Sequence, residues 1–526
     1  MSFYALAPFY RLLGSSAWAM QASAVTLEIL ALAGTVWAAR RRWRTWGAPL
    51  VAGGLALLMS LYGMEVLLYP WNPHLPVLFW VLFLVSVWGV LCDDLALLPV
   101  ATVAGSLCAQ THLPYLGLVG GFGLAVAGVL AARFWRCRDD PRERRRLVWW
   151  TGLSGALGCL VWLPVVVEQI IIGDRPGNLG IIVDSFRHPI SPYVGPGDGV
   201  GLWLERLDPA SLVQGTSSWG GSRWWGLMAL VLWAGSAILA LRMRDRTLVR
   251  LHAVVGLALG LGLIAVSRII GPPWPYLMLW SWGTATLALV AIVATAATVT
   301  TRLAGVSKRG ERRWRSRLPA IALGLLVLVP TVRLARQAPD IEFDAQLSRQ
   351  VAQLVPQVTD ALDDGTVPGG SSGTHLVTWY DPVNLGATGY GLMLELERQG
   401  YDVRARAAAH ERRAVLDHRV VDPVDADAEI HVAVGDNDIQ AWADKGDATR
   451  IAYFDLRTGE QRAEWQHLHD LIVADLEAAD LPELAVQLDR DVFGLAGDPR
   501  LPPEVANLLF YLNQLPPPAA VFATPL

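Results

Sequence analysis

The sequence has few cysteines, and none where a soluble domain would need them. Of its 526 residues only four are Cys, and Cys92, Cys108, Cys137 and Cys159 all lie before residue 160. The polar C-terminal part therefore has no disulfide framework and no zinc-ligand spacing. Charged residues are also scarce at 17%, whereas 53% of the residues are hydrophobic. This balance, with repeated apolar runs near 20 residues, excludes an ordinary soluble protein and predicts a polytopic membrane protein.

Charge is divided unevenly along the chain. Residues 1–334 hold 29 Lys and Arg against 15 Asp and Glu, whereas residues 335–526 hold 14 against 32. The two parts are therefore expected to lie in different surroundings, a membrane domain followed by a soluble domain. Membrane lipid is the partner that this composition predicts, and no nucleic-acid partner is expected.

Ten apolar stretches are candidate membrane spans. The connections at 40–44, 133–146, 242–250 and 302–317 together carry 22 Lys and Arg, which marks them as cytoplasmic by the positive-inside rule. Residue 1 and the C-terminal domain are then extracytoplasmic, and the excess of Ala, Arg, Gly and Val favours a bacterial plasma membrane. Asp93 and Asp94 fall on the cytoplasmic side, where we expect them to cap the helix that follows. The ten stretches are 19–39, 50–69, 77–91, 95–111, 116–133, 147–167, 224–241, 250–267, 276–299 and 317–334.

The first 18 residues do not have the pattern of a signal peptide. MSFYALAPFYRLLG has no basic n-region, and no lipobox or cleavage pattern is found. Its aromatic residues and single Arg predict an amphipathic helix at the outer interface. Such a segment ordinarily follows a first transmembrane helix and its loop, so we expect that the beginning of the protein is missing.

The longest outer loop, 168–223, is rich in aromatic and charged residues, and we expect it to form short helices along the membrane surface. Carboxylates in such a loop can act as general acids or bases, and cations can bind an anionic head group. A solvated surface loop without chemistry is the alternative. The side chains concerned are Glu168, Gln169, Asp174, Arg175, Asn178, Asp184, Arg187 and His188.

Polar side chains within or beside the spans are further candidates, because lipid makes them costly. Glu65 precedes the turn YPWNPHLP, which contains Asn72. A functional carboxylate fits this position, and so does a carboxylate that merely reaches the outer interface. Gln110 and His112 lie at the outer end of a short span that is followed by a proline. A structural role for His112 competes with a substrate or phosphate contact.

From about Ala335 the sequence alternates as in a soluble α/β domain. Residues 375–381, 429–435 and 450–456 are predicted strands, and 385–400 and 460–480 are predicted helices, which together imply a small, partly parallel sheet. The run GATGYG favours a turn and helix packing over a phosphate-binding loop, because it lacks the G-x-G-x-x-G spacing. The closing LPPPAAVFATPL is predicted to be a loose tail.

Several short motifs follow one another in a recognisable order: FYALAPFYRLLG, YPWNPHLP, a span ending in an acidic turn, QTHLPY, W-L-P-x-x-x-E-Q at 162–169 and PGNL at 176–179. Over residues 1 to about 334 this order resembles bacterial GT-C-type integral-membrane glycosyltransferases. The resemblance implies a mainly α fold, a polytopic transmembrane helical bundle, here with a C-terminal extracytoplasmic α/β domain. We therefore expect an interfacial segment at 1–18, a GT-C-like membrane domain at 19–334 and the α/β domain at 335–526.

The resemblance implies transfer of a sugar from a polyprenyl-phosphate donor to an envelope glycan or protein on the outer face, with a carboxylate as general base. In this family the key acidic residue lies in the first outer loop, which here contains no Asp or Glu, so the substitutes are Glu65, Glu168 and Asp174. No cofactor and no divalent metal is indicated. Cations for the phosphate and further substrate contacts are expected among Arg175, Arg187, His188, Arg268, Asn72, Gln110, His112, Gln169 and Asn178.

Two other functions stay open at this stage. A non-catalytic relative would use the same fold to bind envelope glycan or a partner enzyme. A lipid or solute transporter is expected to show an internal repeat with paired broken helices, and no such repeat is found in the sequence. The aromatic outer loops fit carbohydrate stacking, but anchoring at the membrane interface predicts the same residues.

Overall fold

The structure is a computed structural model. The chain divides into two compact units, Met1–Ile341 and Glu342–Leu526. The first is helical and the second contains a mixed sheet, which confirms the mainly α fold with a C-terminal α/β region. The structure describes residues 2–526 except 44–46, 172–176, 190, 211–220, 305–316, 338–344, 382–385, 407–414, 416, 489–491, 497 and 499.

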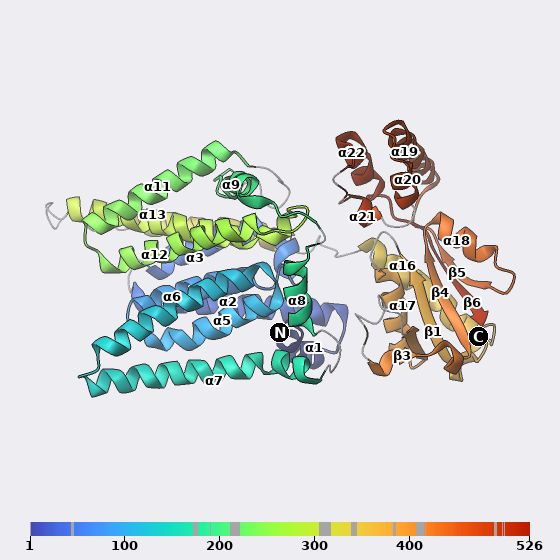
Figure 1. Cartoon of the computed structure of the whole chain (residues 1–526), viewed down its shortest axis with the longest axis horizontal. Helices are drawn as coiled ribbons and strands as arrows, with labels where there is room; N and C mark the ends of the chain where they lie inside the picture. The colour runs from blue at the N-terminus through green and yellow to red at the C-terminus, as the bar shows by residue number, and fades with distance from the viewer. Residues whose placement is uncertain are drawn as a thin grey trace. The chain divides into compact units, whose positions relative to one another are not determined.

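The first unit is a bundle of long apolar helices (Figure 1). Each of the ten predicted stretches coincides with helix, and within the described residues seven helices are long and apolar enough to cross a membrane. The chain is therefore a multi-pass membrane protein. The long helices are α2 (Ala17–Arg42), α3 (Gly47–Leu68), α4 (Val77–Leu91), α5 (Leu98–Thr111), α6 (Pro114–Arg136), α7 (Pro141–Ile171), α11 (Arg223–Arg242), α12 (Arg246–Ser267), α13 (Trp280–Ala304) and α15 (Arg317–Gln337); the 3-10 turns η1 (Leu95–Leu97) and η3 (Pro275–Met278) precede α5 and α13.

Helix α4 forms the centre of this bundle. Its sequence VLFWVLFLVSVWGVL is apolar on every side, and all of its residues except Leu91 are buried. It packs against α2, α5, α12 and α13. A helix that is hydrophobic all round is covered by protein, so α4 needs neither an amphipathic pattern nor full membrane-spanning length. Trp80 satisfies its buried indole N–H by donating to Thr284 Oγ1 of α13 at 3.1 Å.

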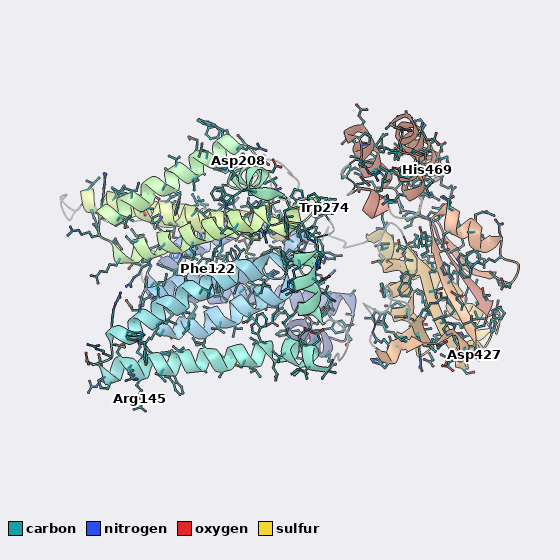
Figure 2. All side chains as sticks on the ribbon, viewed as in Figure 1. Phe122, Arg145, Asp208, Trp274, Asp427 and His469 are labelled. Carbon is teal, nitrogen blue, oxygen red and sulfur yellow. The ribbon has the colours of Figure 1, made fainter. Side chains whose placement is uncertain are left out.

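Short helices mark one end of the bundle. α1 (Ser2–Leu12) and α8 (Asn178–Arg187) lie at this end, and α8 runs across the direction of the long helices (Figure 1). We call it the α8 end. Trp274 lies there, whereas Arg145 lies at the opposite end, which we call the Asp93 end (Figure 2).

Asp93 and Asp94 join several helices at the Asp93 end. Arg41 of α2 donates to both carboxylate oxygens of Asp94, at 2.6 and 3.0 Å. Arg133 of α6 and Arg250 of α12 each approach Asp93 to 2.8 Å. Burial raises the pKa of the Asp94 carboxyl, but Arg41 more than offsets this, and the pKa lies below its ordinary value. The predicted cap is only a minor part of this role: the backbone N–H of Ala96 in η1 helps to lower the pKa of Asp94, but less than Arg41 does.

Helix α3 is broken near the α8 end. Gly63 has φ 70° and ψ 173°, a backbone conformation that residues with side chains rarely adopt. The residues after Gly63 therefore leave the axis of the first part of α3, and Glu65 lies on this redirected segment.

The second unit is built on a six-stranded sheet in the order β3-β2-β1-β4-β6-β5. The strands are β1 (Thr374–Tyr380), β2 (Asp402–Arg406), β3 (Val420–Val421), β4 (Ala428–Val434), β5 (Thr449–Phe454) and β6 (Ala519–Pro525). The first four are parallel, and β6 runs antiparallel to both β4 and β5. The chain leaves β1 and β4 toward opposite edges of the sheet, so the crevice between their carboxyl ends is a topological switch point.

Helices cover the sheet in two groups. α16 (Ala345–Asp363) and α17 (Ala387–Arg398) share the main core with β1 and β4, while α18 (Asp436–Ala443) packs on the other face through Trp442. The packing role predicted for GATGYG is confirmed, because a Cβ at Gly389 would lie 2.5 Å from the Trp379 ring. Four further helices pack around a core of their own: α19 (Gly459–Ala478), α20 (Pro482–Leu488), α21 (Val492–Ala496) and α22 (Pro503–Leu512).

The C-terminal residues form part of the sheet. The prediction of a loose tail is wrong, because Ala519–Pro525 is strand β6, which pairs with β4 on one side and β5 on the other. The five residues 519–523 are buried. The prolines just before the strand suggested a linker. They lie immediately before β6 and do not extend into it.

Candidate functional site

A cavity of about 340 Å³ lies at the α8 end, between the redirected part of α3, the end of α9 (Gly195–Arg206) and the segment that leads into α13. Its wall carries a carboxylate, an imidazole and a guanidinium, those of Glu65, His74 and Arg206. The remaining lining is apolar or aromatic and includes Trp274 and Tyr276. We call this space the Glu65 cavity.

The Glu65 carboxylate is exposed to the cavity. Among the residues that the structure describes, its side chain takes part in no hydrogen bond and no ion pair. A carboxylate in this state is able to accept a proton from a bound group.

His74 and Arg206 are held in apolar surroundings. The His74 ring lies 5.0 Å from the Trp71 ring and 5.8 Å from the Tyr69 ring, centroid to centroid. Burial lowers the pKa of His74 to about 4, so this imidazole is neutral near pH 7. Arg206 is only 7% exposed. Because a guanidinium stays charged in proteins, Arg206 supplies the cavity wall with a cation that can bind an anionic group.

A second space of about 420 Å³ lies along α12, beside α6 and α8. Most of its lining is aliphatic or aromatic, with Leu261 and Ile264 from α12 and Phe186 from α8. Two basic side chains interrupt this lining, His112 and Arg268. We call it the α12 groove. Its chemistry suits a long apolar chain that ends in an anionic group.

Arg268 is positioned by the segment that follows α8. Its guanidinium carbon lies 4.7 Å from the centre of the Tyr193 ring. Val194 N–H donates to the Ile269 carbonyl at 2.9 Å, and Gly271 N–H donates to the Pro192 carbonyl at 3.0 Å. These bonds join the loop to the end of α12, and the exposed Arg268 side chain is held on that junction.

The 3-10 turn η3 separates the two spaces. Tyr276 and Met278 line the Glu65 cavity, whereas Leu277 lines the α12 groove. Tyr62 O–H anchors the turn by donating to the Leu279 carbonyl at 2.8 Å. His112 faces the groove, and burial together with the charge of nearby His74 lowers its pKa to about 4.

Three sequence candidates form a separate group at the start of α8. Glu168 Oε2 accepts from Gln169 Nε2 at 2.6 Å, and Glu168 Oε1 accepts from Asn178 Nδ2 at 3.0 Å. The backbone N–H of Asn178, the first residue of α8, also donates to Glu168 Oε1 at 3.3 Å. Glu168 therefore ties the end of α7 to the N-terminus of α8, where a negative charge is favourable.

The other predicted contacts are dispersed. Asn72 Oδ1 accepts from Ser2 Oγ at 3.0 Å, and Gln110 Nε2 donates to the Val161 carbonyl at 3.2 Å, which links α5 to α7. His188 is exposed beside Asp184 with Nδ1 to Oδ1 at 2.9 Å, and Arg187 is exposed on α8. Substrate contacts of these residues stay predictions. Asp174 and Arg175 lie outside the described residues.

The structure thus unites Glu65 with His74 in one space, and His112 with Arg268 in another. Sequence reasoning missed Arg206, which lies within the predicted outer loop 168–223. The amphipathic pattern of GPGDGVGLWLER could have placed it on a packed helix. Within the described residues, no group of three or more His, Cys, Asp or Glu side chains is placed to hold a metal ion.

Comparison with known proteins identifies a shared fold. No protein-family model matches the sequence, and no curated protein matches it either. The crystal structure of ArnT from Cupriavidus metallidurans bound to undecaprenyl phosphate is similar with a TM-score of 0.50 and 16% identity, covering 86% of this chain and 85% of that chain. The same protein in the apo state gives a TM-score of 0.42 and 15% identity over the same shares. The likeness to the first structure shows the fold, and it agrees with the GT-C-like arrangement expected from the order of motifs.

Proposed function

We propose that this chain is a membrane glycosyltransferase that moves a sugar from a polyprenyl-phosphate donor to a cell-envelope acceptor. The observation that carries this proposal is the α12 groove, an apolar slot with Arg268 and His112 among its lining. A polyprenyl phosphate has the same two parts, a long hydrocarbon and an anionic end. The fold supports this function, since the similar ArnT structure holds undecaprenyl phosphate.

The distribution of charge supports a reaction on the outer face of a bacterial plasma membrane. The arginines around Asp93 and Asp94 belong to the basic connections of the sequence, which the positive-inside rule assigns to the cytoplasm. The Glu65 cavity lies at the opposite end of the bundle. In this orientation the cavity faces the extracytoplasmic side.

In the proposed mechanism the acceptor hydroxyl occupies the Glu65 cavity. Glu65 takes the proton of that hydroxyl while its oxygen attacks the anomeric carbon of the donor sugar. The bond from this carbon to the phosphate oxygen breaks, and polyprenyl phosphate leaves with the electron pair. Arg268 stabilises the charge on the leaving phosphate, and Arg206 offers a second cation from the cavity wall. His74 and His112, neutral near pH 7, act as hydrogen-bonding groups rather than as cations.

The test is a transfer assay with the purified chain in lipid nanodiscs. Radiolabelled sugars linked to undecaprenyl phosphate are supplied as donors, and bacterial envelope glycans as acceptors. We expect label in the glycan with wild-type protein and a transfer rate about 10²- to 10⁴-fold lower with Glu65→Gln. Binding of undecaprenyl phosphate without any transfer would favour the non-catalytic alternative, and absence of both binding and transfer would overturn the proposal.

A further inference from the structure

We infer that the carboxyl edge of the sheet in the second unit binds the hydroxyl-bearing edge of a saccharide. The site is a pocket formed by the ends of β1 and β4 together with α19 and α22. This inference does not depend on the transfer reaction, because every residue of the pocket belongs to the second unit. The polar side chains that line it are Tyr380, Asp436, Asn437, Asp438, His469 and Asn513.

The pocket lies where ligands commonly bind in open α/β sheets. Tyr380 is the last residue of β1, and Gly435 directly follows β4, so the pocket opens at the topological switch point between these two strands. In open α/β sheets, ligands bind in the crevice outside the carboxyl ends of the strands at such a point. Asp427, which precedes β4, lies at the opposite end of the sheet from His469 (Figure 2).

A buried polar network holds one carboxylate of the pocket in place. Asp438 Oδ2 lies 3.2 Å from His431 Nε2, and the other ring nitrogen of His431 lies 2.8 Å from Thr378 Oγ1. Thr378 donates in turn to Glu429 Oε1 at 2.6 Å. His431 is also stacked on Trp442, with ring centroids 3.9 Å apart and planes 10° apart. An Asp438 side chain fixed by this network needs little reordering when a ligand arrives.

The size of the pocket limits what enters it. Its volume is about 50 Å³, and since about 10–15 Å³ of such space holds one water molecule, only a few water-sized groups fit inside. It can therefore receive two neighbouring hydroxyls, but not a whole sugar ring. A hydroxyl donates one hydrogen bond and accepts others, and the Asn437 and Asn513 amides offer both roles beside the Asp438 acceptor. One wall is fixed by Trp465, whose ring stacks against His469 at 5.1 Å and 23°.

The charges around the pocket disfavour the other ligand classes. Arg457 is engaged by Asp436 through both oxygens, at 3.0 and 3.2 Å, and by Asp455 at 3.0 Å, and its side chain is only 2% exposed. Asp436 and Asp438 repel phosphate. An ammonium group brings only donors, so it leaves the amide N–H groups of the pocket without acceptors. A neutral polyhydroxyl compound best matches the mixture of hydrogen-bond donors and acceptors in the pocket.

The experiment is saccharide-array binding with the full-length protein in nanodiscs. The array displays neutral, amino-bearing and phosphorylated oligosaccharides, and we expect a signal on neutral ones. Asp438→Asn and Asn513→Ala are expected to weaken that signal at least tenfold. Asp444→Asn, which removes the same charge just after α18 but outside the pocket, is expected to keep it.

Three outcomes would overturn the inference: no neutral saccharide bound, equal binding by the pocket variants, or binding confined to phosphorylated or amine ligands. Asn513 is exposed, so Asn513→Ala keeps the test valid if Asp438→Asn does not fold. Glu65→Gln separates this inference from the proposed function. It is expected to keep the array signal while abolishing transfer, and loss of the signal in Glu65→Gln would assign saccharide binding to the first unit instead.

Discussion

The rings of Tyr276 and His112 lie 6.1 Å apart, centroid to centroid, and each belongs to the wall of a different space. Tyr276 lines the Glu65 cavity and His112 lines the α12 groove. The walls of the two spaces therefore lie beside one another at this pair. An acceptor in the cavity and a donor phosphate in the groove would meet there, which is the arrangement that a displacement at the anomeric carbon requires.

Glu65→Gln tests the catalytic assignment. The amide keeps the shape of the side chain but cannot accept the acceptor proton, so we expect transfer to fall by about 10²- to 10⁴-fold. Undecaprenyl phosphate binding should change little, because Glu65 does not line the α12 groove. Rates of sugar transfer and lipid binding are measured on the same preparation. Asp139→Asn, an exposed carboxylate in the α6–α7 connection, is the control, and equal rates in Glu65→Gln and wild type would rule out Glu65 as the base.

Arg268→Ala tests the phosphate site. Loss of a charge-assisted hydrogen bond costs about 1.5–3 kcal/mol, so we expect undecaprenyl phosphate to bind about 10- to 150-fold more weakly. Native mass spectrometry in lipid-supplemented detergent gives the occupancy. Arg138→Ala, whose side chain is 77% exposed at the other end of the bundle, should bind as wild type does. An unchanged affinity in Arg268→Ala would remove this residue from the donor site.

Glu168→Ala tests the structural role found for a residue that the sequence offered as a catalytic candidate. The substitution removes the acceptor of the Asn178 backbone N–H, and loss of such a cap costs about 1 kcal/mol. We expect faster hydrogen exchange in α8 with little change in α12. Abolished transfer with unchanged exchange in α8 would instead support chemistry at Glu168.

Asp94→Asn tests the ion pairs at the Asp93 end. Asp94 has 7% side-chain exposure, whereas Arg41 is 39% exposed. Because this ion pair is only partly buried, its removal should cost less free energy of unfolding than removal of a fully buried pair. We expect destabilisation by about 1–3 kcal/mol. Thermal unfolding in detergent measures it, with Asp139→Asn as the matched control. A melting temperature equal to that of the wild type would show that the arginines are satisfied without this carboxylate.

Acid should destabilise the protein through His74 and His112. Their folded pKa values of about 4 lie below the ordinary value of 6.5, so the unfolded chain binds more protons between these limits. Stability is therefore constant above about pH 6.5 with respect to these groups and falls as the pH drops toward 4, by up to about 3 kcal/mol for each histidine. Melting temperatures between pH 7 and pH 4.5 test this, and His112→Gln should show a shallower fall. Parallel curves for the variant and the wild type would contradict it.

Much of the fold could be predicted from local patterns. Apolar length placed the helices, including α4, and the alternation of β-branched and polar residues placed β1, β4 and β5. What could not be predicted depends on contacts distant in sequence. β6 was taken for a tail because three prolines precede it, yet β4 and β5 provide two edges on which Ala519–Pro525 pairs.

The candidate site could also be predicted only in part, because some of its residues depend on contacts distant in sequence. Glu65 and His112 stood out because charge or imidazole is costly within or beside a span. Arg268 was named only as a cation for the donor phosphate that the family resemblance implies. Arg206 did not stand out, since only the packing of α9 turns a loop-like Glu-Arg pair into a buried guanidinium. Asp94 has its role through Arg41, a partner 53 residues away.

Photo-crosslinking of undecaprenyl phosphate to the full-length chain in membranes tests the proposed donor site most directly. A benzophenone-bearing analogue is irradiated, and the labelled peptides are identified by mass spectrometry, with unmodified undecaprenyl phosphate as competitor. If the α12 groove holds the donor lipid, labels that the natural lipid competes away are expected on its lining, in 112–117 and 261–270. Labels confined to helices that do not line the groove, such as α7, or labels that the natural lipid does not compete, would contradict this donor site.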